Sequence, residues 1–336
     1  MTISPAFVKR PGNGPVFQAD EDLKQMRQVL AVAHLYHIHH VRQSDIATQL
    51  GISQAGVSRL LKLAEDGGIV RTIVLPPEGM FPDLEDGLAR KYGLARVAVV
   101  ETGNNEDDIP RALGTYAANM LSGDLKGKIL GFTSWSVTLR EMARLMPVEV
   151  DSPFTHVVEM LGDLGSPTLQ HEATLATSQL SYAFTADPVF LRTPGVARSP
   201  DIREMSLSDV YVRRAMEMFD RIDVAMIGVG PADFHGPLEE HDNFFNSEQL
   251  AEVRSQGAVG QILQRFIDSE GRPIKTPLDD LVVGVSLDQI RKAGQRMLIA
   301  GGSSKHEPIA AALAGKWIDT LVTDVGVASY LLNRTG

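Results

Sequence analysis

The sequence contains no cysteine, which excludes disulfide bonds, thiolate metal sites and cysteine nucleophiles. No apolar run reaches the roughly 18 residues that a membrane-spanning helix needs. Residues 1–20 lack the apolar core of a secretion signal, and we expect them to form a flexible polar tail. From these absences we expect a cytoplasmic protein that does not bind a membrane.

The composition is that of an ordinary globular protein. The chain has 336 residues, of which 43% are hydrophobic and 22% are charged, and this length suggests two domains. A formal charge of −10 argues at first against nucleic-acid binding. Residues 1–75, however, hold eight lysines and arginines against six acidic residues, together with four histidines. The acidity therefore belongs to the remainder of the chain, and one end can still bind DNA.

Apolar periodicity divides the chain into a helical head and an α/β body. One amphipathic helix is predicted over 20–43, and two shorter helices follow it. The apolar positions of the first helix are Leu23, Met26, Leu30, Ala33 and Val41. The expected divisions are a tail over 1–20, a helix-turn-helix DNA-binding domain over 21–75, a linker over 76–95, and an effector-binding and oligomerisation domain over 96–334.

Beyond the linker, short apolar runs alternate with amphipathic helices. This order indicates βα units and a largely parallel sheet. Strands are predicted over 95–101, 128–133, 155–161, 187–191, 223–230, 281–286, 296–302 and 320–324. The predicted fold class is α/β, with a small N-terminal helix-turn-helix domain before a large Rossmann-like domain.

The stretch "RQSDIATQLGISQAGVSRLLKLAEDGGIVR", from Arg42 to Arg71, has the pattern of a helix-turn-helix. Ser44 and Ser53 are suited to capping two successive helices, and Gly51 is suited to the turn between them. "RTIV" after "GGIV" has the alternation of a wing strand. A plain helical hairpin with a polar outer face is the alternative. The two serine caps, the glycine turn and the small Ala47 where the two helices cross favour DNA binding.

The outer face of the second helix has side chains that can contact bases and phosphates. Gln pairs with adenine, Arg with guanine, and Ser or Lys with phosphate. The candidate DNA contacts are Ser44, Ser53, Gln54, Ala55, Ser58, Arg59 and Lys62. The histidines of "HLYHIHH" have metal-like spacing, but no carboxylate or cysteine completes a ligand set. We therefore predict no metal site.

Two loops of the α/β domain are suited to an anion. In "KILGFTSWSVTL" a strand is followed by hydroxyl residues and a helix, so Thr133, Ser134, Ser136 and Thr138 can face an anion at the helix N-terminus. Capping of that helix is the alternative role for these hydroxyls. In "IAGGSSKHEPIAAAL", Lys305 stands at a helix start, where a cation is unfavourable unless it meets a ligand anion. An ordinary surface lysine is the alternative.

Four stretches together resemble the SorC/DeoR family of bacterial sugar-responsive transcription regulators. They are "SDIATQLGISQAGVSRLLKLAEDGGIV", "GFTSWSVTL", "FIDSEGRPI" with "VVGVSLDQIRKAG", and "IAGGSSKHEPIAAALAGKWIDTLVTDVGVASYLL". The resemblance covers about residues 22–333. It implies a sugar-sensing domain folded like ribose-5-phosphate isomerase and glucosamine-6-phosphate deaminase, and a dimeric or tetrameric protein. The family commonly has glycine where this chain has Ser136, which makes a different effector plausible.

The resemblance and the loops together define a candidate effector site. The family pattern places a ligand-contacting lysine at Lys305 and an aspartate near the ligand at Asp268, although Asp268 can equally be a turn residue. Gln170 can bond a sugar hydroxyl, and Arg192 is a further anion candidate. The candidate effector contacts are Gly131, Thr133, Ser134, Ser136, Thr138, Gln170, Asp268 and Lys305.

The expected function is a DNA-binding regulator of a carbohydrate or polyol catabolic operon. Its operator affinity would depend on a small sugar, sugar phosphate or polyol, with no other cofactor. The alternative is an enzyme, because the implied fold also hosts sugar-phosphate isomerases and deaminases. "IGVGPADFHGPL" resembles a deaminase stretch, but no carboxylate base with a partner acid can be assembled. A constitutive architectural protein is a third alternative, which would not need the large domain.

Overall fold

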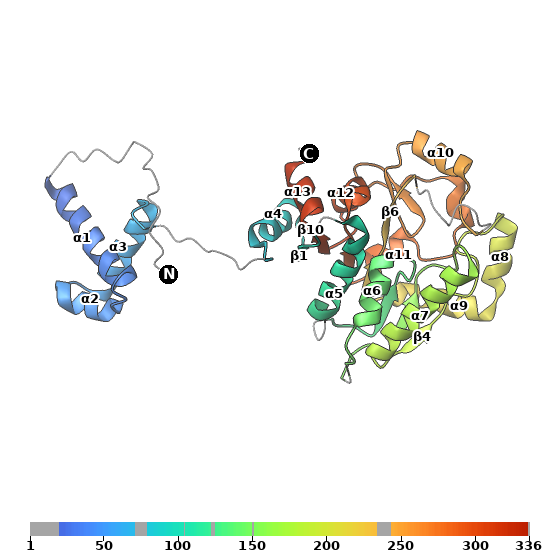
Figure 1. Ribbon diagram of the computed structural model, residues 1–336, viewed down its shortest axis with the longest axis horizontal. Helices are drawn as coiled ribbons and strands as arrows, with labels where there is room; N and C mark the ends of the chain where they lie inside the picture. The colour runs from blue at the N-terminus through green and yellow to red at the C-terminus, as the bar shows by residue number, and fades with distance from the viewer. Residues whose placement is uncertain are drawn as a thin grey trace. The chain divides into compact units, whose positions relative to one another are not determined.

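The computed structural model describes residues 20–70, 79–103, 105–121, 125–149, 151–233 and 243–334. The chain forms two compact units that divide after Leu75, and each is described by itself (Figure 1). Most of the expected tail and the wing strand expected at 71–74 lie outside the described residues. So do Phe234 and His235 of the deaminase-like stretch.

Three helices form the smaller unit: α1 (Asp20–His37), α2 (Gln43–Leu50) and α3 (Gln54–Asp66). The first helix ends at His37 rather than at 43, because the chain turns through His40 at φ 53°. Val32, Ile46 and Val57 are completely buried where the three helices meet. Leu30, predicted to face inward, is 56% exposed, and Val29 and Val32 fill that face of α1 instead.

The larger unit contains a seven-stranded sheet and a three-stranded sheet. The seven strands are β1 (Arg96–Val100), β2 (Ile129–Phe132), β3 (His156–Glu159), β4 (Asp187–Val189), β5 (Val224–Ile227), β9 (Gln295–Ile299) and β10 (Thr320–Asp324). Their order is β1-β10-β9-β5-β2-β3-β4, and every pair is parallel. The parallel α/β class predicted from the sequence is confirmed.

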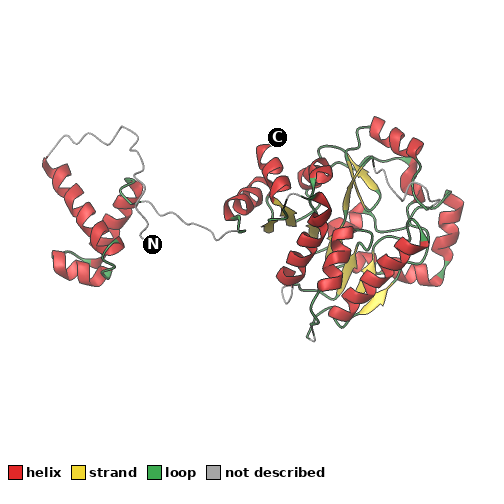
Figure 2. Ribbon diagram, in the orientation of Figure 1, coloured by secondary structure: helices red, strands yellow, loops and turns green. Residues whose placement is uncertain are grey.

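Helices cover both faces of this sheet (Figure 2). The remaining helices are α4 (Pro82–Tyr92), α5 (Ile109–Leu121), α6 (Val137–Leu145), α7 (Pro167–Ala183), α8 (Pro200–Ser208), α9 (Val210–Glu217), α10 (Ser247–Ser255), α11 (Leu287–Lys292), α12 (His306–Ala314) and α13 (Val325–Asn333). Alternate strand residues enter two separate cores, one of which includes α5, α6 and α7. No helix of the described residues has the length and apolarity needed to cross a membrane.

Four short 3₁₀ helices join these elements: η1 (Glu106–Asp108), η2 (Phe219–Arg221), η3 (Pro277–Leu281) and η4 (Ser303–Lys305). Helices α5 and α6 pack closely because Gly114 has no side chain. A Cβ atom there would lie 2.8 Å from the backbone nitrogen of Met142. This contact fixes α6, and with it the loop before α6, against the sheet.

In the larger unit, the structure departs from the predicted elements in three places. Residues 281–286 make only isolated bridges instead of a strand. The run 223–230 is divided into β5 and β6 (Val229–Pro231), and β6 joins β7 (Gly260–Ile262) and β8 (Arg265–Ile267) in a small antiparallel sheet that was not predicted. Helix α4 occupies much of the segment expected as linker and packs against α13.

Candidate functional site

Helix α3 presents the polar face that the sequence predicts. Val57 and Leu61 are buried. The side chains on the other side are exposed: Gln54, Ala55, Ser58, Arg59 and Lys62. Ser53 caps the helix, since its Oγ accepts a hydrogen bond from the Gly56 amide at 3.1 Å. Gly51 takes the left-handed conformation, φ 65°, that the turn between α2 and α3 requires.

Ser44 does not have the capping role predicted for it. Helix α2 begins at Gln43, and Arg42 is its N-cap residue without a side-chain cap. Ser44 therefore lies inside the first turn, where its Oγ donates to Oδ1 of Asp45 at 3.2 Å. Its carbonyl accepts a hydrogen bond from the Thr48 hydroxyl at 3.0 Å. The side chain is exposed, so it stays a candidate for a phosphate contact.

A cavity of about 300 Å³ lies at the carboxyl ends of the central strands. The chain order reverses between β2 and β5. Strands β3 and β4 extend the sheet on one side of β2, whereas β5, β9 and β10 lie on the other side. Loops diverge at such a reversal and leave a crevice for a ligand. The cavity is lined by residues that follow β2, β5 and β9, and by the β7–β8 hairpin.

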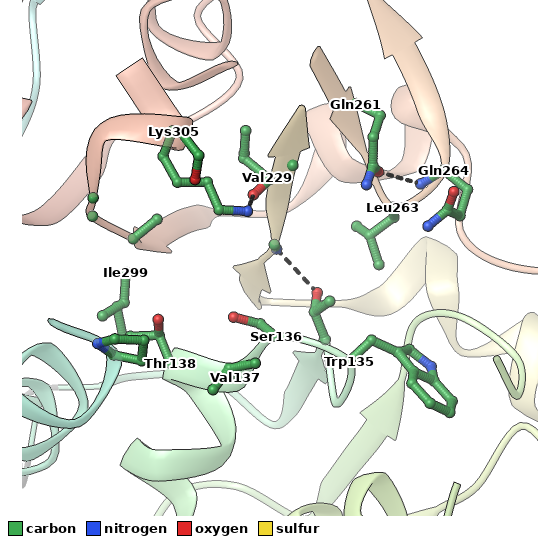
Figure 3. A pocket seen from close by; sticks show the side chains of 18 of the residues that line it. Trp135, Ser136, Val137, Thr138, Val229, Gln261, Leu263, Gln264, Ile299 and Lys305 are labelled. Atoms are coloured by element: carbon green, nitrogen blue, oxygen red, sulfur yellow. Dashed lines mark hydrogen bonds between the residues drawn. The ribbon is translucent and has the colours of Figure 1, made fainter. Parts of the chain in front are cut away.

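Figure 3 shows most of the lining side chains. Among the described residues, the lining consists of Glu106, Pro110, Thr133, Trp135, Ser136, Val137, Thr138, Leu161, Leu164, Gly228, Val229, Gly230, Phe244, Gln261, Leu263, Gln264, Ile299, Ala300, Gly301, Gly302, Ser304 and Lys305. Among these, Lys305 is the one cation and Glu106 the one carboxylate. Within the described residues, no group of three His, Asp or Glu side chains could hold a metal ion.

The hydroxyl loop after β2 is held in place by hydrogen bonds within the protein. Oγ1 of Thr133 donates to the Met226 carbonyl at 2.8 Å and accepts from the Gly228 amide at 3.3 Å. Oγ of Ser136 caps α6 by accepting from the Leu139 amide at 3.4 Å. The loop therefore bridges β2 and β5, and it presents the first turn of α6 to the cavity.

The backbone of Ser136 is unstrained at φ −77°. Serine therefore fits at a position where the family that the sequence resembles commonly has glycine. Thr138 lies in the first turn of α6, is 8% exposed and also lines the cavity. A hydroxyl side chain at position 136 therefore reduces the space beside the helix start without disturbing the helix.

Lys305 has no counter-ion among the described residues. Its Nζ donates to the Val229 carbonyl at 2.6 Å, and it forms no ion pair with any described carboxylate. Burial lowers the pKa of Lys305 to about 8. Two of its three N–H donors have no partner in the described part of the chain, so this ammonium group at a helix start is suited to an anionic ligand in the cavity.

The loop that carries Lys305 is held by a buried carboxylate. Oδ2 of Asp324 accepts the Gly302 amide at 2.7 Å. Gly302 itself lies at φ 93°, where a side chain would be strained. Residue Glu106 accepts the Ser303 amide at 3.3 Å from the other side. Strand β10, through Asp324, thus fixes a loop that follows β9.

Four of the predicted effector contacts do not line this cavity. Gly131 lies within β2, where a Cβ atom would be 2.6 Å from Sδ of Met160. Ser134 is buried behind the loop at 1% exposure. Nε2 of Gln170 donates to the Gly165 carbonyl at 3.0 Å. Oδ1 of Asp268 accepts two backbone amides of its own turn, and Oδ2 pairs with Arg272 at 2.8 Å. Within the described structure, all four groups serve the local fold.

Arg192, the further anion candidate, is already occupied by two carboxylates. Its guanidinium group contacts Asp163 at 2.8 Å and Glu159 at 3.4 Å. Burial raises the pKa of Glu159, and the neighbouring Arg192 charge opposes that rise. The arginine therefore neutralises a partly buried acidic pair and has no place in the cavity lining.

Sequence reasoning missed much of the cavity wall. Trp135 stands inside the stretch that was recognised, but its side chain gave no periodic signal. Residues Gln261, Leu263 and Gln264 belong to the small antiparallel sheet, whose strands have only three residues each. An Asn-Gly or Asp-Gly pair normally marks a hairpin of this kind, and none is present here. Only the three-dimensional fold brings these side chains to the cavity.

Comparison with known proteins places this architecture among transcriptional regulators. A family model described as "Putative sugar-binding domain" matches residues 77–333. The deoxyribonucleoside regulator of Bacillus subtilis is 31% identical over 315 residues, which is 93% of this chain and 99% of that protein. Transcriptional regulator LsrR of Escherichia coli K12 is 27% identical, covering 94% of this chain and 97% of that protein.

The same likeness extends to a solved structure. The full-length sorbitol operon regulator SorC from Klebsiella pneumoniae superposes with a TM-score of 0.71 at 26% identity, over 92% of this chain and 100% of that one. These relatives are transcriptional regulators and not enzymes, so the isomerase or deaminase alternative has no support among them.

Proposed function

The chain belongs to the SorC/DeoR family of sugar-binding transcriptional regulators, and on this premise we propose that it controls a carbohydrate or polyol catabolic operon in the cytoplasm. Helices α2 and α3 act as a helix-turn-helix, and α3 enters the major groove of operator DNA. The cavity at the ends of β2, β5 and β9 holds a small sugar, sugar phosphate or polyol. Binding of that effector changes the operator affinity.

The DNA-binding role rests on the outward face of α3. Gln54, Ser58 and Arg59 occupy the first turns of the helix and are exposed. Side chains near the start of a recognition helix are the ones that reach base edges. Arg59 can form a bidentate pair with guanine, and Lys62, one turn later, is suited to phosphate.

The effector-binding role rests on one observation above all: the ammonium group of Lys305 lines the cavity and forms no ion pair with any carboxylate of the described residues. Its ammonium group and the first turn of α6 can together bind a phosphate or carboxylate. Glu106 and Thr138 line the same cavity and can bond hydroxyl groups. A polyhydroxy compound with an anionic end fits this combination best.

Control of operator affinity follows from linkage between the two sites. A ligand that binds one arrangement of subunits better than another shifts the population toward that arrangement. We propose a homodimer or homotetramer that presents paired α3 helices to a roughly palindromic operator. Coupling of this kind typically changes affinity about 5- to 150-fold.

A thermal-shift screen followed by operator binding tests the proposal. The full-length chain is heated with a panel of sugars, polyols, sugar phosphates and sugar acids, because a ligand that binds only the folded state raises the melting temperature. Each hit is then added to the chain bound to a duplex selected from a random pool. The proposal predicts a hit that changes duplex affinity. A chain that binds no specific duplex, or whose affinity no hit changes, contradicts it.

A further inference from the structure

The β7–β8 hairpin has a buried turn, although turns of this kind normally face water. Ile262 pairs with Arg265, so the loop consists of Leu263 and Gln264 alone. The two side chains are 3% and 6% exposed, and both line the effector cavity. The tip of the hairpin is therefore part of the cavity wall.

The backbone of this turn is held in a conformation that its residues disfavour. Leu263 and Gln264 lie at φ 49° and 64°, as a two-residue type I′ turn requires. Asn or Gly takes this conformation with less strain than Leu or Gln. Oε1 of Gln261 stabilises the turn by accepting a hydrogen bond from the backbone amide of Gln264 at 2.8 Å. Strain of this kind is retained where the side chains have a use.

Gln264 supplies an unpartnered polar group at the cavity. Its side-chain amide makes no hydrogen bond to any described residue, and although the residue is only 6% exposed, the amide atoms remain accessible from the cavity. The amide can therefore bond a ligand group that both accepts and donates hydrogen bonds, as a hydroxyl does.

The two sides of the cavity differ in charge. Figure 3 shows Lys305 on one side and Trp135, Leu263 and Gln264 on the other. Lys305 is the single cation among the lining residues of the described chain. Leu161, Leu164 and Phe244 add further apolar surface to the cavity lining. A second anionic group placed there would lose its hydration without gaining a counter-ion.

We propose that Leu263 and Gln264 are the specificity-determining residues of this cavity. They select an effector with one anionic end, bound near Lys305, and an uncharged far end. That far end offers a hydroxyl group to the side-chain amide of Gln264, and it offers C–H groups to Leu263 and the Trp135 ring. The inference rests on the proposed effector site, and it names sugar monophosphates or sugar acids as the class, to the exclusion of bisphosphates.

Matched pairs of ligands test this selection. Full-length wild-type chain is titrated calorimetrically with the 6-phosphates of glucose and fructose and their 1,6-bisphosphates, with ribose 5-phosphate and ribose 1,5-bisphosphate, and with inorganic phosphate. The tightest monophosphate is expected to bind at least about tenfold better than its own bisphosphate. Gluconate and galactonate replace the monophosphates if the anionic end is a carboxylate.

Variants separate Gln264 from the anion side. Gln264→Ala is expected to weaken binding of the tightest monophosphate about tenfold, while the affinity for inorganic phosphate stays unchanged. Gln264→Asn suits the left-handed turn but is shorter, so it should keep the melting temperature and lose affinity. Gln256→Ala, an exposed glutamine outside the cavity, is the control. Gln264→Lys should favour the bisphosphates.

The outcomes separate this inference from the proposed function. A bisphosphate that binds wild type as tightly as its monophosphate overturns the selection, as does a Gln264→Ala variant that keeps full monophosphate affinity. Equal weakening of monophosphate and inorganic phosphate shows general damage to the cavity and also overturns it. A wild-type chain that binds none of the probes rejects the effector site itself, and the inference with it.

Discussion

The outward face of α3 and the wall of the cavity differ in how far the protein has already engaged their polar groups. On α3 the five outward side chains are exposed, and the only hydrogen bond that they form to the described residues is a long one, from Nε of Arg59 to the Ala55 carbonyl at 3.4 Å. In the cavity wall, Thr133, Ser136 and Gln261 are each bonded within the protein. Substitutions on the outward face of α3 should therefore change the affinity for DNA but not the stability of the fold. Substitutions in the cavity wall can change both the affinity for the effector and the stability.

The largest expected effect is that of Lys305→Ala on binding of an anionic effector. Removing the one cation of the cavity lining should weaken binding about 10- to 150-fold, since hydrogen bonds to charged groups contribute about 1.5–3 kcal/mol. Isothermal titration of the best anionic hit measures this loss. Lys292→Ala, which removes an exposed lysine paired with Asp220, is the control and should bind normally.

Arg59→Ala should have a similar but site-selective effect on DNA. A bidentate base contact contributes about 1–3 kcal/mol, so affinity for the selected duplex should fall about 5- to 150-fold. Affinity for random duplex should change far less. Fluorescence anisotropy with both duplexes at one salt concentration measures this, with Arg27→Ala on α1 as the control. Equal losses on both duplexes would show that Arg59 contacts only phosphate.

A smaller effect is expected from pH. The pKa of Lys305 is lowered to about 8, so its proton is lost as pH rises through 8. Affinity for an anionic effector should then fall by up to about tenfold per unit above pH 8, because a phosphate ligand is already fully ionised there. Titrations between pH 7 and 9.5 measure the slope. Lys305→Arg stays protonated throughout and should remove the slope, and a wild-type affinity that is flat above pH 8 would contradict the lysine's role.

The smallest effect distinguishes the two serines of the head. Ser53 caps α3, whereas Ser44 lies inside α2. Loss of a cap costs about 1 kcal/mol, so Ser53→Ala should speed amide exchange of 54–66 about fivefold. Ser44→Ala should leave the exchange of 43–50 unchanged or slower, because alanine favours a helix interior. Hydrogen exchange of the full-length chain, followed by mass spectrometry, measures both segments. Faster amide exchange of 43–50 in Ser44→Ala would show that Ser44 caps α2 after all, as the sequence predicts.

Sequence periodicity predicted those features that depend on neighbouring residues. The turn at Gly51, the cap at Ser53 and the outward face of α3 follow from spacing within one short segment. Most of the parallel strands were found because they are buried apolar runs, whereas the edge strand β4 is largely exposed. Where the end of a helix depends on tertiary packing, as at His37, the prediction was six residues too long.

The cavity depends on contacts between distant residues, which spacing cannot show. Thr133, Ser136, Thr138 and Lys305 were predicted because they follow strands at the ends of recognisable motifs. Asp268 and Gln170 were expected beside them, but each bonds the backbone of its own turn or helix start. Gln264 was missed because its turn lacks glycine and its strands are three residues long.

The most direct test of the central claim is operator affinity measured with and without effector. Fluorescence anisotropy of the selected duplex is followed for the wild-type chain and for Lys305→Ala, with the best anionic hit titrated into each. We expect the effector to change the wild-type affinity for the duplex at least about fivefold, and the Lys305→Ala variant to respond only at much higher effector concentrations. Identical titration curves for the two chains, or no response in either, would contradict it.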